Sequence, residues 1–384
     1  MITALIFIIV LAILIFVHEL GHFLAARASG IRVDAFKIGF GPKIFAWTKG
    51  ETEYGVNLIP FGGYVKIHGE NPDVEAESGP DASRSFMNKP RWKQVVVLVA
   101  GVTFNFIFAW ALYATGFMFG VTATSDGFEK YADNFTDERV MITYVQPGSP
   151  AEKAGVAVGD VILAVRSPAS VSSSDPIPTD TSKEVLALEN SLTVESVQGI
   201  ISANNGAPVD LTLRNKDGAR EVEIVPTQGI VEGKYAVGIG MQKVGDLQLP
   251  FFTAVTEGFR YMIIMIKETA LSLGTFILNI FQGTANFSDV AGPVGIAGIV
   301  GNAADLGFTY LIMITALISI NLGVINLVPF PALDGGRVLF VLIEGVIRRR
   351  IPMKFSNIVN GIGFALLMLL MLVVTYRDIA KIFK

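Results

Sequence analysis

The stretch MITALIFIIVLAILIFVHELGHFLAA, from Met1 to Ala26, decides the fold class. Its first 17 residues carry no charge and are rich in Ile, Leu, Val and Phe, which is long enough for a membrane-spanning helix of roughly 20 residues. A secretory signal peptide is the alternative interpretation. A positively charged start is missing, however, and Glu19 would lie inside the apolar region, so a membrane span is favoured.

The composition of the whole chain also favours a membrane protein. Charged residues make up 17% of the sequence, whereas soluble domains carry about 25%. The net charge of -4 gives no basic face, so we expect no nucleic-acid partner. The chain has no cysteine, which excludes disulfides and cysteine-based zinc sites. Any metal site must therefore use His, Asp or Glu.

The charge-free stretches predict about four transmembrane helices in a polytopic α-helical membrane protein. Apart from the first, they lie in Gln94–Ser125, Gly307–Leu333 and Phe355–Tyr376. Residues 251–290 are apolar but are interrupted by Glu257, Arg260, Lys267 and Glu268, which favours an amphipathic helix in the membrane interface. The predicted regions are a first membrane part (1–125), a soluble domain (126–250), an interfacial segment (251–306) and a second membrane part (307–384).

The soluble domain has valine-rich strand patterns separated by Gly and Pro turns. We expect a turn and short helix at 147–156. Strands are expected at 139–145 and 159–165, a helix at 194–204, a hairpin over 209–225 and a surface loop at 166–182.

The distribution of basic residues predicts the orientation. The loop between the first two spans, residues 28–93, carries nine Lys or Arg residues, and Arg348–Arg350 lie between the last two spans. Both regions are expected on the cytoplasmic side, which puts both termini and the soluble domain outside.

The motif His18-Glu19-Leu20-Gly21-His22 carries the chemistry of the first span. Residues four apart share one helix face, so both imidazoles can hold one zinc ion. Glu19 is positioned to act as a general base. Three polar groups in an apolar span are costly, which favours function over packing between helices.

A catalytic zinc ion needs a third protein ligand, and two residues are candidates. His68 lies in a polar loop. Asp334 is the stronger candidate because it follows an uncharged stretch broken by two prolines, Asn326-Leu327-Val328-Pro329-Phe330-Pro331-Ala332-Leu333-Asp334-Gly335-Gly336. The alternative for Asp334 is a helix cap at the interface. If 251–290 does not cross the membrane, Asp334 and His18 lie at similar depth.

The HELGH helix, the NxxPxPxLDG segment and the domain between them resemble the site-2 protease family of intramembrane zinc metalloproteases. Within it, the chain is most similar to the bacterial regulator of sigma-E proteases. The resemblance covers essentially the whole chain. It implies zinc held by His18, His22 and Asp334, Glu19 as catalytic base, and an extracytoplasmic PDZ-like α+β domain over 139–242. Members of this family often carry two PDZ domains, whereas this chain has room for one.

The resemblance also implies how substrates bind. Residues 33–69 correspond to a membrane-associated β-hairpin, and Gly62 and Gly63 are candidates for a strand edge that a substrate extends. An ordinary cytoplasmic hairpin is the alternative. Asn321 and Asn326 are candidates to hold substrate backbone, or they pack between helices. Gly101 and Asn105 also match family positions and are interpreted as close helix packing.

The expected function is hydrolysis of peptide bonds in or near the membrane segment of single-span proteins, such as anti-sigma factors or remnant signal peptides. The resemblance implies a bacterial plasma membrane as the location. The PDZ-like domain is expected to bind a C-terminal peptide or to exclude bulky substrates. A membrane-anchored PDZ scaffold without activity is the main alternative. A transporter is a third, but it predicts internal repeats, and the sequence shows none.

Overall fold

The computed structural model describes residues 2–70, 78–125, 127–166, 192–215, 218–231, 233–285 and 290–382. The chain forms two compact units, Met1–Met118 with Pro250–Lys384, and Phe119–Leu249. The first unit contains the helices α1 (Ile2–Ala28), α3 (Arg91–Phe119), α7 (Phe251–Gln282), α8 (Pro293–Leu306), α9 (Phe308–Leu327), α10 (Asp334–Ile347) and α11 (Met353–Ile382). The last residue of α3, Phe119, is already counted with the second unit.

Five helices in the described residues are long and apolar enough to cross a membrane, one more than predicted. The additional helix is α7, where the sequence predicted an interfacial segment. Its four charges all lie between Glu257 and Glu268, so the last 14 residues of the helix, Thr269–Gln282, are uncharged. Together the five helices identify a multi-pass membrane protein.

The hairpin of β1 (Val33–Lys49) and β2 (Thr52–Ile67) folds back on itself. Residues 35–38 of β1 pair with residues 63–66 of β2 on one side and with 53–56 on the other. Two short 3-10 helices, η1 (Ala82–Arg84) and η2 (Phe86–Asn88), follow before α3. The hairpin packs against α1, with Phe36 and Val65 in a core that also contains Phe23.

A second core joins α1 to α8 and α9. It contains Val10, Leu14 and Val300, with Leu311 and Ile318 packed against them. Near the start of α1, Thr3 lies against Gly301 of α8. Further along α1, Nε2 of His18 lies 3.1 Å from Oδ2 of Asp334, which follows α9 and begins α10. Thus α1 and α9 run in the same direction.

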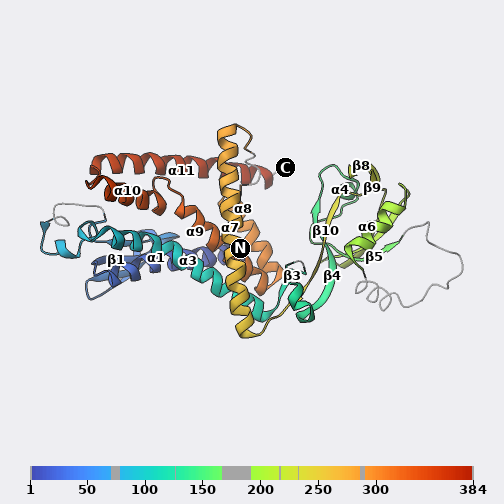
Figure 1. Ribbon diagram of the computed structural model, residues 1–384, viewed down its shortest axis with the longest axis horizontal. Coiled ribbons are helices and arrows are strands. Elements are labelled where there is room, and N and C mark those ends of the chain that lie inside the picture. The colour runs from blue at the N-terminus through green and yellow to red at the C-terminus, as the bar shows by residue number, and fades with distance from the viewer. Residues whose placement is uncertain are drawn as a thin grey trace. The chain divides into compact units, whose positions relative to one another are not determined.

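Helix α7 has a different orientation from the helices around it. It runs across the direction of α1 and α11 (Figure 1). Gly258 packs against the backbone of Ala114 in α3, and Thr269 donates a hydrogen bond to Asn321 of α9 at 3.2 Å. The same helix therefore contacts both α3 and α9.

In its described residues, the second unit contains a six-stranded sheet in the order β3-β10-β4-β5-β6-β7, a separate β8–β9 pair, two short α-helices and one 3-10 helix. Thr193 caps α6 by accepting from the Ser196 amide, and Val197 and Ile201 of that helix pack on the core of the sheet. The predicted strands, hairpin and helices are confirmed; the loop predicted at 166–182 lies outside the described residues except for Arg166.

The elements described in the second unit are β3 (Val121–Thr124), η3 (Glu129–Asn134), β4 (Phe135–Val145), α4 (Pro150–Lys153), β5 (Val161–Arg166), α6 (Val194–Ala203), β6 (Val209–Asn215), β7 (Gly218–Ile224), β8 (Thr227–Val231), β9 (Lys234–Ala236) and β10 (Ile239–Leu247).

Candidate metal centre

Two histidines of α1 point to one place in the interior of the membrane unit. His18 and His22 are one helical turn apart and both are buried. Their Nε2 atoms lie 3.2 Å from each other. The Nδ1 atom of His22 lies 2.8 Å from the Val97 carbonyl oxygen and donates to it, which leaves the lone pair of its Nε2 free to bind a metal.

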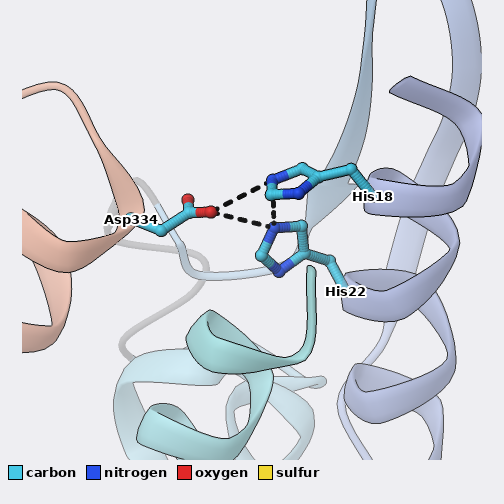
Figure 2. A group of neighbouring side chains, drawn as sticks. All are labelled: His18, His22 and Asp334. Atoms are coloured by element: carbon cyan, nitrogen blue, oxygen red, sulfur yellow. Dashed lines mark hydrogen bonds and ion pairs between the residues drawn. The ribbon is translucent and has the colours of Figure 1, made fainter. Parts of the chain in front are cut away.

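Asp334 reaches the histidines from a break between two helices. Helix α9 ends at Leu327, and α10 begins at Asp334 itself. Gly335 lets the chain turn back closely, because a methyl group there would lie 2.3 Å from the Val328 carbonyl oxygen. Figure 2 shows the Asp334 carboxylate facing both imidazoles across the gap between their helices. Its Oδ2 lies 3.1 Å from His18 Nε2 and 3.4 Å from His22 Nε2.

The spacing of these three atoms fits a tetrahedral metal ion. Ligands about 2.0–2.1 Å from zinc lie about 3.3 Å apart when the geometry is tetrahedral. The three distances here are 3.1, 3.2 and 3.4 Å. Two imidazoles and one carboxylate are also a donor set that suits zinc. The three residues can therefore hold one divalent metal and leave a fourth position open.

A cavity of about 350 Å³ opens beside the three side chains. Glu19, half-buried, lines it together with the potential ligands. The β2 edge from Tyr64 to Ile67 also lines it. In the described part of the chain, this edge has a strand partner, β1, on one side only. The backbone of Val65 forms a hydrogen bond with Glu19, which joins the strand edge to the HELGH helix.

The structure separates the two candidates for the third ligand. Asp334 lies with the histidines, whereas His68 is buried at the end of β2, where its amide donates to the Arg32 carbonyl oxygen. The sequence favoured Asp334 because it follows an uncharged stretch, and the structure places it accordingly.

The other predicted residues have different positions. Gly63 packs beside Glu19 and Ile15, close to the cavity. Gly62 packs against Phe40 instead. Asn321 bonds Thr269 of α7, which favours helix packing over substrate binding. Asn326 is half-buried, and the described lining of the cavity does not include it.

Two features of the site were missed from the sequence. Arg337, one turn after Asp334, forms an ion pair with Glu70, and both residues line the cavity. The sequence did offer one indication, because Arg337 lies three residues after Asp334 and therefore on the same side of a helix. Asn105 of α3 has its side-chain amide nitrogen 3.1 Å from Nδ1 of His18, whereas the sequence analysis interpreted this residue as part of close helix packing.

Comparisons with known proteins cover nearly the whole chain. The profile of peptidase family M50 matches residues 6–370. A Clostridium perfringens protein, named as a candidate zinc metalloprotease, is 35% identical over 367 residues, which are 95% of each chain. A similarly named protein of Clostridium acetobutylicum is 32% identical, covering 97% of this chain and 96% of the relative. Zinc metalloprotease RasP of Oceanobacillus iheyensis is 28% identical, covering 100% of both.

The matched range runs from α1 into α11, so it contains both the HELGH helix and the segment that ends at Asp334. M50 is a zinc-dependent peptidase family, and the predictions of an intramembrane peptidase with a zinc cofactor are thereby confirmed. Since one profile spans the membrane unit and the β domain alike, this chain belongs to peptidase family M50, the site-2 proteases whose motifs its sequence resembles.

Proposed function

We propose that this chain hydrolyses peptide bonds in or near the membrane segment of single-span proteins, with zinc held by His18, His22 and Asp334. The observation that carries the proposal is the meeting of three ligand atoms within 3.4 Å of one another in an apolar unit. Ionisable groups in such surroundings are costly, so a cluster of three is favoured only where it performs a function.

Bound zinc supplies Lewis acidity, which polarises a peptide carbonyl and makes water acidic near neutral pH. Glu19 is the proposed general base. It lies one residue from His18 and lines the same cavity, so it can take a proton from water and deliver it to the leaving amine. In this proposal Asp334 and the two histidines would bind the zinc ion, while Glu19 would transfer the proton.

The strand edge Tyr64–Ile67 is the proposed substrate platform. A helical substrate has its backbone hydrogen bonds satisfied, so it must unwind before attack. An unwound segment can add to this edge, which lines the cavity beside Glu19. Among the tentative substrate residues, Gly63 and Asn326 remain candidates; Gly62 and Asn321 have packing contacts instead.

We also propose that the hairpin dips into the bilayer. Its far half exposes large apolar side chains, which water disfavours and lipid accepts. They are Phe40, Ile44, Phe45, Trp47, Val56, Leu58 and Ile59, all at least 41% exposed.

The β domain is proposed to be PDZ-like and to bind an extended C-terminal peptide. A cavity of about 180 Å³ lies between α6 and the β9–β10 segment, lined by Ile201, Tyr235, Ile239 and Met241 among others. A helix beside a strand with an apolar floor suits a peptide that adds as a further strand. Exclusion of substrates with bulky outer domains is the second role that this domain can have.

The proposed location is a bacterial plasma membrane, with both termini and the β domain outside the cytoplasm. Arg348–Arg350 lie between α10 and α11, and the hairpin loop is also rich in basic residues. The positive-inside rule places both on the cytoplasmic face.

The test compares purified wild-type protein with Glu19→Gln for zinc content and for cleavage of a single-span substrate. We expect the wild type to cut, and the variant to keep about one zinc per chain without cutting. If neither protein cuts nor binds zinc, the proposed centre is wrong, and a peptide-binding scaffold becomes the better proposal.

A further inference from the structure

Helix α3 supports both histidines from behind. The carbonyl oxygen of Val97 accepts the Nδ1 proton of His22 at 2.8 Å. Eight residues later on the same face, the amide of Asn105 lies 3.1 Å from Nδ1 of His18. Asn105 has no exposed surface, and its own backbone carbonyl accepts from Ser319 Oγ of α9 at 2.8 Å. Each histidine therefore meets one polar group of α3 through its Nδ1.

If both histidines bind a metal through Nε2, each must donate a hydrogen bond from its Nδ1, so both contacts need an acceptor on α3. A neutral imidazole that gives its Nε2 lone pair to a metal carries its proton on Nδ1, so Nδ1 is a donor. Val97 presents an oxygen to that donor. Asn105 is placed with its amide nitrogen, also a donor, toward His18, while its buried Oδ1 has no hydrogen-bond partner in the described residues.

Turning the Asn105 amide by half a turn removes this conflict. The amide keeps its shape, Oδ1 comes to face His18 Nδ1, and the nitrogen takes the vacated position. The contact then becomes N–H···O, matching the contact that His22 makes with Val97. Oxygen acceptors behind metal-bound histidines fix the tautomer and the ring orientation, and they make the imidazole a better ligand.

We propose that Asn105 is a positioning residue that accepts the Nδ1 proton of His18 and so orients this imidazole for zinc. The inference rests on the proposed metal centre and adds a supporting group to it. A packing role for Asn105 predicts something different, because packing depends on the volume of the side chain and not on whether it presents an acceptor.

The experiment measures zinc affinity by chelator competition on purified full-length protein carrying Glu19→Gln, so no catalytic activity is needed. Two substitutions separate the alternatives. Asn105→Leu has similar volume but no acceptor, and we expect the dissociation constant for zinc to rise roughly 10- to 100-fold. Asn105→Asp presents only acceptors, and we expect it to bind zinc as well as Asn105 does or more tightly. Ser319→Ala is the matched control, since it removes a buried hydrogen bond to the backbone carbonyl of Asn105 and leaves the Asn105 side chain unchanged.

The outcomes are distinct. Loss of affinity with Leu and retention with Asp supports the proposal. Wild-type affinity with Leu, or an equal loss with Asp and Leu, overturns it. If the variants do not fold, the ¹⁵N spectrum of zinc-loaded protein without Asn105 substitutions decides: a proton on His18 Nδ1 supports the proposal, and a bare Nδ1 overturns it. If that protein binds no zinc, the proposed metal centre itself fails.

Discussion

Gly101 of α3 packs directly against the two histidines, and alanine at this position tests the ligand geometry. An added methyl group would lie 2.4 Å from Nε2 of His22 and 2.8 Å from Cε1 of His18. Non-bonded heavy atoms are comfortable at about 3.5 Å or more, so an imidazole or a helix must move by about 1 Å. The contacted atom of His22 is the proposed ligand atom itself.

A shift of this size is large for a metal site, where ligand distances vary by about 0.2 Å. Inserting one methyl group into a tightly packed interior costs about 1–3 kcal/mol. If this cost falls on the metal-binding geometry, the dissociation constant for zinc rises roughly 10- to 100-fold. Chelator competition on protein carrying Glu19→Gln measures this change, and cleavage of a single-span substrate by otherwise wild-type protein should fall in parallel.

Gly116→Ala on the same helix is the matched control. Its methyl group would meet Met313 Sδ at 2.8 Å, and a thioether side chain can move aside. We expect its zinc affinity to stay within about threefold of the wild type. Wild-type zinc affinity and cleavage in Gly101→Ala would refute the assigned geometry, because the methyl group cannot fit while both imidazoles keep their places.

Two further predictions concern contacts that support the site and its helices. Arg337→Met leaves the Glu70 carboxylate unpaired, and we expect it to lower the unfolding free energy by about 2 kcal/mol in detergent. Glu70→Gln in the same protein should recover part of this loss, and an additive further loss would contradict the pairing. Asp378→Ala removes the oxygen that accepts from the Gly295 amide at the start of α8, with an expected loss of about 1–2 kcal/mol in thermal unfolding. Asp378→Asn, which retains an oxygen, should lose less; equal losses would count against capping.

Much of the site could be predicted because its signals are local or costly. The i, i+4 spacing of His18 and His22 fixes their common face in any helix. Polar groups in a membrane span are rare enough to mark a site by themselves. The position of Asp334 followed from the prolines and glycines around it, which end α9 and begin α10 where the sequence expected a break.

Other features depend on tertiary contacts that a single sequence does not display. Residues 35–38 of β1 pair on both sides with one strand that folds around them, and this depends on bulges and bends in the hairpin. Asn321 and Asn105 look alike as polar residues in apolar helices. Only the neighbours distinguish them, since Asn321 meets Thr269 whereas Asn105 meets a histidine.

The direction of the helices bears on the placement of α7. Thr3 lies against Gly301, before α9, and His18 lies against Asp334, after α9, so α1 and α9 run the same way. Helix α3 returns the chain to the side on which α1 began. If α7 then crossed the bilayer, α9 would have to run opposite to α1, because α8 has only 14 residues and is too short to restore the direction.

A helix α7 that lies along the membrane interface, without crossing, would let α1 and α9 run in the same direction. It agrees with the course of α7 across α1 and α11 (Figure 1), and with its charges between Glu257 and Glu268. Under this arrangement the HELGH helix and the Asp334 segment enter from the same face. Both then end in the same half of the bilayer, where His18, His22 and Asp334 can meet. We therefore propose that α7 contacts lipid along one face at the membrane interface, although its length and composition would also allow a crossing.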